Sequence, residues 1–298
     1  MTASWIAIAR KDVADATRSR MLWGFTLVFV AFLGMALPVA GELFPDVVTV
    51  SPAKALAGVA MLAQLFIPGI AIVAGYMAVV GERRTGSLRV LLGAPFTRGR
   101  VLAGKLVGRL VVTLVALTTG FAVAAALVVA LYGAPTAAAF GGFVATGLLL
   151  GVVFTGLAVG GSAATATRGH AMTATIGSFM GMVFFWQPLA AGAYAAVTGG
   201  LPGRIAEPWY FLLKRVNPLE AYRVLTEAAL DERVDAVPQF PLEDVPRHAP
   251  LEQLAMTNRL AGPVPFYLQD WFAALILLAW AVIPVLVGYH RFRTTDLG

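Results

Sequence analysis

Residues 57–80, AGVAMLAQLFIPGIAIVAGYMAVV, form an apolar run without a single Asp, Glu, Lys or Arg. A helix needs about 20 such residues to cross the hydrocarbon core of a bilayer. The apolar side chains would cover the whole circumference of this helix, whereas a surface helix of a soluble protein has one apolar stripe. The run therefore predicts a transmembrane helix.

Five further runs share this length and lack of charge. They cover residues 21–40, 110–131, 140–164, 172–197 and 271–289. Only 13% of the 298 residues are charged and 59% are hydrophobic, whereas soluble globular proteins carry about 25% charged residues. A soluble fold of this size would need more charge to cover its surface. We predict an all-α polytopic membrane protein with six transmembrane helices.

The distribution of Lys and Arg predicts the orientation of these helices. With the N-terminus in the cytoplasm, the inner side holds 14 of the 22 basic residues but only four of the 16 acidic ones. Cytoplasmic loops of membrane proteins carry such an excess of basic residues. The same placement accounts for the net charge of +6 without a nucleic-acid partner. We expect a multi-pass protein of the plasma membrane with both termini in the cytoplasm.

Residues 1–20 precede the first predicted span. Within them, Trp5, Ile8, Asp12 and Val13 occupy neighbouring positions of a helix, and most other charges fall elsewhere. This pattern is typical of a short helix that lies along the inner membrane surface, with Trp5 as an interfacial anchor. An ordinary positively charged flank of the first span is the alternative.

A basic connection, residues 81–109, follows the second span and reads GERRTGSLRVLLGAPFTRGRVLAGKLVGR. Its residues 87–92 form one or two amphipathic helical turns, and Pro95 stops them because proline cannot continue a helix. Thr97 can cap the next helix, which runs on into the third span. The connection therefore predicts a compact helical hairpin in the cytoplasm.

Residues 99–105 of this hairpin match the spacing of a phosphate-binding loop, G-x-x-x-x-G-K, but the match is incomplete. Leu106 stands where that loop needs Ser or Thr to bind Mg²⁺, and no predicted strand precedes it. We therefore expect no nucleotide, cofactor or catalytic residue in this chain, and ATP and Mg²⁺ on a partner. The three histidines are scattered and Cys is absent, so we also expect no metal site.

The connection at residues 198–270 separates the fifth and sixth spans. Residues 207–230 predict two helices that break at Asn217-Pro218, and residues 237–250 predict a loop rich in proline and acid. Apolar and aromatic side chains recur in the first half, so we expect a small helical extracytoplasmic cap resting on the membrane. An exposed linker is the alternative.

The polar side chains of note within the predicted spans are two glutamines, each close to a proline. Gln64 precedes Pro68, and Gln187 precedes Pro188. Proline bends a helix and frees a carbonyl group, so these four residues are candidates for a cavity wall. A plain hydrogen bond between helices, worth about 1 kcal/mol, is the alternative. The spans carry no ionisable residue, which argues against a proton-coupled transporter.

The predicted hairpin, residues 81–109, closely resembles the cytoplasmic segment of ABC-2-type permeases. The elements that carry the resemblance are Glu82, Gly86, the short helix at 88–92, Pro95 and the Gly104-Lys105 pair. The opening ARKDVADATRSRMLW, the NPLEAYRVL of residues 217–225 and the closing YHRFR of residues 289–293 are also similar. The resemblance covers the whole chain, 1–298, as a single transmembrane domain.

This resemblance implies a permease subunit, which we expect to work as an exporter in a homodimer, or a close heterodimer, with two separate ABC ATPase subunits. The hairpin would be the coupling helix inserted into the ATPase. The implied coupling residues are Glu82, Arg83, Arg84, Gly86, Leu88, Arg89, Leu92, Pro95 and Arg98. Within the family, the basic hairpin and the large outer loop most resemble the permeases of copper-enzyme maturation systems, typified by nitrous oxide reductase maturation.

Two other functions stay open at this point. A membrane enzyme acting on lipid-linked substrates would need acids, bases or metal ligands near the bilayer surface, and Glu220, Asp231 and Glu232 are the obvious outer candidates. A scaffold without transport activity would use the 198–270 connection to hold an extracytoplasmic partner. An adjacent reading frame with a complete nucleotide-binding loop would favour the transporter over both.

Overall fold

The computed structural model describes the chain from Trp5 to Thr294 with some gaps. The described residues are 5–17, 23–24, 27–32, 34–35, 50–85, 97–238, 240, 242–243 and 251–294. All regular secondary structure within them is helical. The predicted all-α class is therefore confirmed for this part of the chain.

Five helical segments of the described chain are long and apolar enough to cross a membrane. They are Pro52–Arg83, Arg98–Tyr132, Ala137–Ala164, Arg168–Thr198 and Asp270–Thr294. Each contains one of the predicted spans. The sixth prediction, residues 21–40, is described only at 23–24, 27–32 and 34–35, which are helical. Phe29 there is buried against the ring of Phe66, with 4.9 Å between the centroids.

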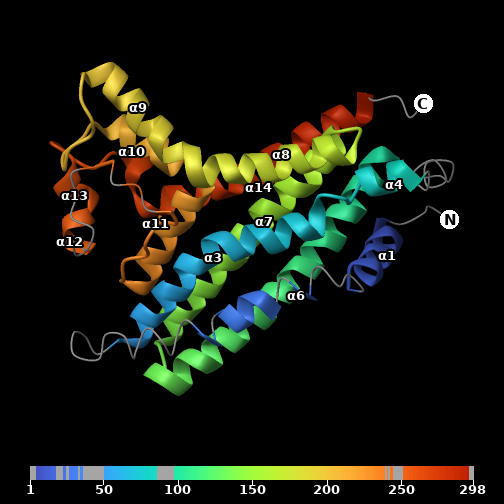
Figure 1. Ribbon diagram of the computed structural model, residues 1–298, viewed down its shortest axis with the longest axis horizontal. Coiled ribbons are helices and arrows are strands. Elements are labelled where there is room, and N and C mark those ends of the chain that lie inside the picture. Colours follow the sequence, from blue (N-terminus) through green and yellow to red (C-terminus); the bar gives the residue numbers. More distant parts are fainter. Residues whose placement is uncertain are drawn as a thin grey trace.

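The helices alternate in direction and form an elongated bundle (Figure 1). Helix α3 (Pro52–Gly75) continues through a turn into α4 (Val80–Thr85), and α6 (Arg98–Tyr132) returns. Helix α7 (Ala137–Ala164) follows. The next span consists of α8 (Arg168–Met180), the π-helix η1 (Gly181–Phe185) and α9 (Trp186–Thr198). Helix α14 (Asp270–Thr294) completes the bundle. We call the end that carries α4 the hairpin end, and the opposite end the loop end.

Side-chain caps fix where these helices begin. The hydroxyl groups of Ser51, Thr97, Thr136 and Thr167 each accept a hydrogen bond from a backbone N–H in the first turn that follows. Such caps satisfy donors that the helix itself leaves unpaired. The prediction that Thr97 caps the third span is confirmed.

Helix α7 lies at the centre of the core. Its glycines allow neighbouring helices to approach closely: a Cβ atom added at Gly147 would lie 2.5 Å from the ring of Phe121 on α6. One added at Gly156 would lie 2.6 Å from the carbonyl oxygen of Ala281 on α14. Side chains at these positions would push the helices apart, so the glycines set the spacing of the bundle.

Helix α1 (Trp5–Thr17) confirms that the N-terminal segment is helical. It packs side by side with the first turns of α6 (Figure 1), and Ile8 and Ala9 are buried in that contact. A Cβ atom at Gly104 would lie 2.8 Å from the Cβ atom of Ile8. The apolar face of α1 is thus directed at α6, while the side chain of Trp5 is 42% exposed.

The connection before α14 contains α10 (Pro208–Arg215), α11 (Pro218–Leu230), α12 (Leu251–Leu254), α13 (Met256–Arg259) and the 3₁₀-helix η2 (Phe266–Leu268). The predicted break at Asn217-Pro218 is confirmed, because Asn217 caps α11 by accepting from the N–H of Leu219. Most of the loop predicted at 237–250 lies outside the described residues.

The position of α11 differs from the expected cap on the membrane, because α11 enters the bundle and packs against α3, α7 and α14. The turn before it lies level with the middle of two long helices. Asn217 Nδ2 donates to the carbonyl oxygen of Met182 at 2.8 Å, and Trp280 Nε1 donates to that of Val216 at 2.8 Å. The apolar side chains that suggested a cap, such as Leu219 and Tyr222, are instead buried among helices.

Candidate functional site

A buried charge cluster holds the base of the predicted hairpin. Lys105 Nζ on α6 lies 2.9 Å from Glu82 Oε1 on α4 and 3.3 Å from Asp12 Oδ1 on α1. Arg109 Nε, one turn further along α6, lies 2.6 Å from Asp12 Oδ2. Lys105 and Asp12 are almost fully buried. Two positive and two negative groups thus join three helices, and removal of any one would leave an uncompensated buried charge.

Glycines on α6 make this cluster possible. A Cβ atom at Gly108 would lie 2.8 Å from the Cβ atom of Asp12, as one at Gly104 would from Ile8. Helix α1 therefore occupies the face of α6 on which the Gly-Lys sequence lies. The spacing that imitates a phosphate-binding loop is explained by helix packing and by the two carboxylates around Lys105.

A second set of contacts at the hairpin end surrounds Phe292, which is fully buried near the end of α14. The guanidinium carbons of Arg83 and Arg98 lie 5.6 and 5.7 Å from the centroid of its ring. Arg98 Nη1 also donates to the carbonyl oxygens of Phe292 and Arg293, at 2.7 and 2.9 Å. Arg98 thereby caps the C-terminus of α14, where a cation is favoured by the helix dipole.

These contacts locate the predicted coupling residues that the structure describes. Glu82, Arg83 and Arg98 all contact other parts of their own chain, and Arg83 Nη1 donates to the carbonyl oxygen of Thr165 after α7. The side chain of Arg84, and Gly86, Leu88, Arg89, Leu92 and Pro95 as whole residues, lie outside the described residues. Contact of any of them with an ATPase stays a prediction.

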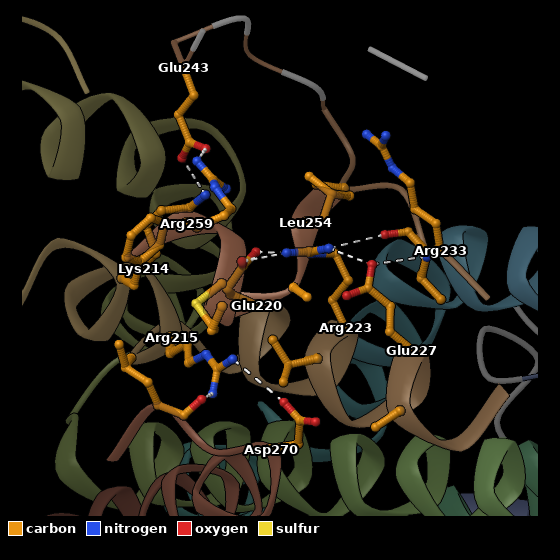
Figure 2. A pocket seen from close by; sticks show the side chains of 18 of the residues that line it. Lys214, Arg215, Glu220, Arg223, Glu227, Arg233, Glu243, Leu254, Arg259 and Asp270 are labelled. Atoms are coloured by element: carbon orange, nitrogen blue, oxygen red, sulfur yellow. Dashed lines mark hydrogen bonds and ion pairs between the residues drawn. The ribbon is translucent and has the colours of Figure 1, made fainter. Parts of the chain in front are cut away.

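At the loop end, a cavity of about 510 Å³ lies between α9, α10, α11, α13 and the start of α14 (Figure 2). A volume of this size is typical of small-molecule sites. Its wall includes five basic and five acidic side chains. They are Lys214, Arg215, Arg223, Arg233 and Arg259, and Glu220, Glu227, Asp235, Glu243 and Asp270.

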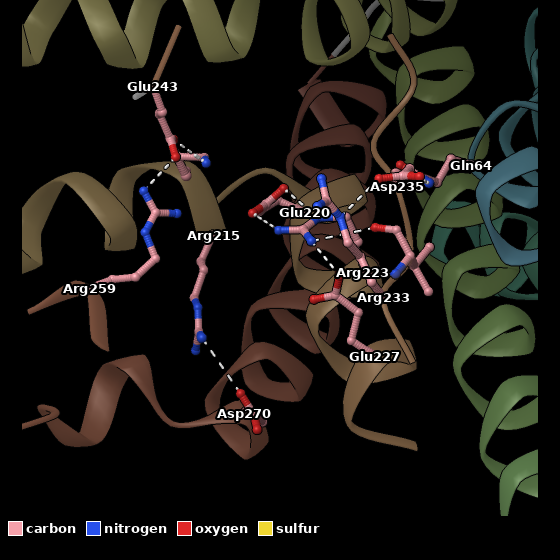
Figure 3. Close-up of polar contacts among 12 residues, drawn as sticks. Gln64, Arg215, Glu220, Arg223, Glu227, Arg233, Asp235, Glu243, Arg259 and Asp270 are labelled. Atoms are coloured by element: carbon pink, nitrogen blue, oxygen red, sulfur yellow. Dashed lines mark hydrogen bonds and ion pairs between the residues drawn. The ribbon is translucent and has the colours of Figure 1, made fainter. Parts of the chain in front are cut away.

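One side of the cavity is a three-residue ion pair on α11 (Figure 3). Arg223 bridges Glu220 and Glu227, with 2.6 Å between nitrogen and oxygen in each pair. Burial raises the pKa of Glu220, but the positive charges of Arg223 and Lys214 outweigh burial and bring that pKa down to about 2. Glu227 also accepts from the N–H of Val234 at 3.1 Å. Glu227 therefore holds Val234, in the segment after α11, against α11.

The other side of the cavity centres on Glu243. Its carboxylate accepts from Lys214 at 2.5 Å, Tyr210 at 2.7 Å and Arg259 at 2.6 Å. Burial raises the pKa of Glu243, but the charges of Lys214 and Arg259 outweigh burial and lower it to about 2. Glu243 remains ionised at neutral pH and ties α10 to α13.

Arg215 connects α10 to the start of α14. Its Nη1 donates to the carbonyl oxygens of Leu268 at 2.6 Å and Gln269 at 3.2 Å, and its Nη2 lies 3.6 Å from Asp270 Oδ1. The guanidinium is almost fully buried, while Asp270 is more than half exposed. The first turn of α14 is thus held at the cavity wall.

The four residues predicted to line a cavity fall at different places. Gln187 lies on the cavity wall. Gln64 is buried on α3 and donates to the carbonyl oxygen of Asp235 at 2.7 Å (Figure 3). Asp235 lies in the segment after α11, so this is not the bond between two helices that the alternative expected. Pro68 is buried inside α3, and Pro188 lies in the first turn of α9, after η1. The structure therefore brings Gln187 to the cavity and Gln64 beside it.

Sequence reasoning did not place the charged groups of α11 inside the bundle. The predicted spans contain no ionisable residue, but Glu220, Arg223 and Glu227 arrive from the connection. Their spacing of three and four residues is the signal that could have revealed them, because such residues are neighbours on a helix. Of the candidates for enzyme chemistry, Glu220 is engaged by Arg223 and Glu232 accepts from Ser51. Within the described chain, no three His, Asp or Glu side chains could hold a metal ion.

Comparison with known proteins gives concordant matches. A family model described as "ABC-2 family transporter protein" matches residues 6–297. A curated protein of Pseudomonas aeruginosa, "Probable ABC transporter permease protein NosY", is 35% identical over 246 residues, which cover 78% of this chain and 84% of that protein. A protein of the same description from Stutzerimonas stutzeri is 31% identical over 297 residues, which cover 96% of both chains.

Proposed function

Because the chain belongs to the ABC-2 family of transporter proteins, we propose that it forms the translocation path of an ATP-driven exporter whose ATPase is a separate subunit. The chain is a multi-pass membrane protein and a permease subunit of the ABC transporter family. The observation that carries the proposal is the family match over nearly the whole length, on a chain that places a basic connection between two long apolar helices.

The hairpin base supports a coupling role for residues 86–96. These residues lie between α4 and α6, and Lys105 joins α4, α6 and α1 through Glu82 and Asp12. A force that the ATPase applied to the hairpin would therefore act on three helices together. Glu82, Arg83 and Arg98 would serve by holding the base in place, and Leu88 and Leu92 would contact the ATPase.

The basic residues at the hairpin end support the proposed orientation. The hairpin end carries Arg83, Arg98, Arg168 and Arg291, so it would face the cytoplasm. Both termini would lie on that side of the plasma membrane. The cavity at the loop end would then face the outside, where the 198–270 connection is available to an extracytoplasmic partner.

A second copy of the chain is the other expected partner. Helices α8 and α9 with η1 expose Ile176, Phe184, Phe185 and Leu189. Lipid or a second permease would cover these apolar side chains. We propose a homodimer, with substrate passing between the two copies. ATP and Mg²⁺ would bind to the ATPase, and this chain would hold no cofactor.

The test replaces Leu88 and Leu92 with Asp and measures how much ATPase subunit co-purifies with the permease. We expect the double variant to lose most of the bound ATPase, because charged groups would disrupt an apolar contact. The matched control is Leu201→Asp, an exposed leucine at the loop end, which should retain it. If the double variant keeps its ATPase and stimulates ATP hydrolysis as before, the hairpin is not the coupling element.

A further inference from the structure

Helix α14 reaches from the hairpin base to the cavity. It contains 25 residues and is therefore about 37 Å long at 1.5 Å per residue. At the hairpin end, the ring of Phe292 lies against the guanidinium groups of both Arg83 and Arg98. Arg83 lies on α4, before the predicted hairpin, and Arg98 begins α6 after it. A change in the distance between Arg83 and Arg98 would therefore change their contacts with the ring of Phe292.

Contact with α7 supports the middle of α14. Pro284 lies there, and a proline removes one backbone hydrogen bond and weakens a helix. The carbonyl group of Pro284 lies directly against Gly160 of α7, and Gly288 lies against the carbonyl of Gly160, so closely that neither glycine could carry a Cβ atom. This direct packing against α7 opposes bending of α14 at Pro284, so a displacement at one end of α14 can reach the other end.

At the other end, α14 contacts the cavity at two points. Trp280 Nε1 donates at 2.8 Å to the carbonyl oxygen of Val216, in the turn between α10 and α11. Arg215, which lines the cavity, holds residues 268–270 at the start of α14. An axial shift or tilt of α14 would therefore move the wall of the cavity as well as the turn.

We propose that α14 is the connection through which the hairpin base controls the shape of the charged cavity, with Phe292 receiving the movement and Trp280 and Arg215 passing it on. This inference rests on the proposed function, because the movement starts with the ATPase. Phe292 and Trp280 are positioning residues that touch no substrate in this scheme. The two-state element is the position of α14 against α10 and α11, and ATP binding biases it through the hairpin.

A thiol reporter in the cavity can detect this movement. The chain contains no Cys, so Thr257→Cys, at an exposed residue of the cavity wall, supplies its sole thiol. The permease variant is purified with its ATPase subunit, and its reaction rate with a water-soluble maleimide is measured without nucleotide and with ATP and vanadate. We expect the nucleotide to change the rate by about threefold or more, as a shift between two populated states would.

Two substitutions then interrupt the connection at different points. Phe292→Leu removes the aromatic ring between the two arginines, and Trp280→Phe removes only the N–H donor to Val216. We expect both to reduce the nucleotide-dependent change to less than about 1.5-fold, while the amount of bound ATPase and its rate of hydrolysis stay as in the parent. The matched control is Trp271→Phe, since the Trp271 N–H donates to Gln269 at the exposed start of the same helix; it should respond like the parent.

The outcomes separate the inference from the proposed function. If no ATPase binds the parent, both are overturned. If ATPase binds but the parent thiol does not respond to nucleotide, or if Trp280→Phe responds as strongly as the parent, the inference alone is overturned. Should Phe292→Leu fail to fold, Trp280→Phe decides the question by itself.

Discussion

The hairpin base and the cavity are both built from buried ion pairs, but they differ in what the pairs enclose. At the hairpin base, Asp12, Glu82, Lys105 and Arg109 contact one another directly and glycines bring their helices together. At the loop end, balanced charges line a cavity of about 510 Å³. Buried ion pairs therefore hold three helices together at the hairpin base, whereas at the loop end they form the wall of a cavity.

This difference predicts unequal sensitivity to the loss of a charge. Removal of one charge at the hairpin base leaves the partner charges buried without compensation. Removal of one charge at the cavity wall leaves the partner charges next to a space that water can enter. The hairpin base should therefore be the less tolerant of the two regions.

The largest effect is expected for Lys105→Met. This change leaves Asp12 and Glu82 without their shared cation, and breaking a buried pair typically costs about 3–5 kcal/mol. Thermal unfolding in detergent measures the loss. The matched control is Arg100→Met, an exposed position on the same helix, which should change stability by less than about 0.5 kcal/mol. Equal losses in the two variants would show that the Lys105 cluster does not hold the hairpin base.

A smaller effect is expected for Glu243→Gln at the cavity. The amide keeps the shape of the side chain but loses the charge that attracts Lys214 and Arg259, and hydrogen bonds to charged groups are worth about 1.5–3 kcal/mol. The same unfolding measurement at neutral pH gives the loss, and Glu252→Gln, at an exposed residue of α12, is the control.

The pH dependence of that loss has a definite sign. The pKa of Glu243 is lowered from 4.5 to about 2, so its ionised form stabilises the fold above pH 4.5, and this contribution disappears as the pH falls towards 2. The stability difference between the parent and Glu243→Gln should be constant from pH 7 to pH 5 and then shrink. A difference that grows on acidification would contradict the assigned ion pairs.

Much of the bundle could be predicted from sequence, because long uncharged runs admit few alternatives to a membrane helix. Five of the six predicted runs lie in described helices, and Thr97 and Asn217 mark helix starts as expected. Local signals of this kind need no knowledge of distant residues. The first run, residues 21–40, stays a prediction outside its few described positions.

The charged contacts between different elements could not be predicted, because they depend on which elements meet in space. The resemblance implied a coupling role for Glu82, but no sequence pattern indicated that its carboxylate lies against Lys105. The pattern of α11 indicated an apolar face without indicating what covers it, and its insertion carries Glu220 and Arg223 into the bundle. The same pattern fits a helix on a membrane and a helix among other helices.

The most direct test of the account is to label single cysteines at the two ends from outside intact cells. We expect Thr257→Cys, in the cavity wall, to react with a membrane-impermeant maleimide, and Arg89→Cys, in the hairpin, to react only after the cells are opened. Labelling of Arg89→Cys in intact cells would place the hairpin on the outside and contradict its role as the contact for a cytoplasmic ATPase.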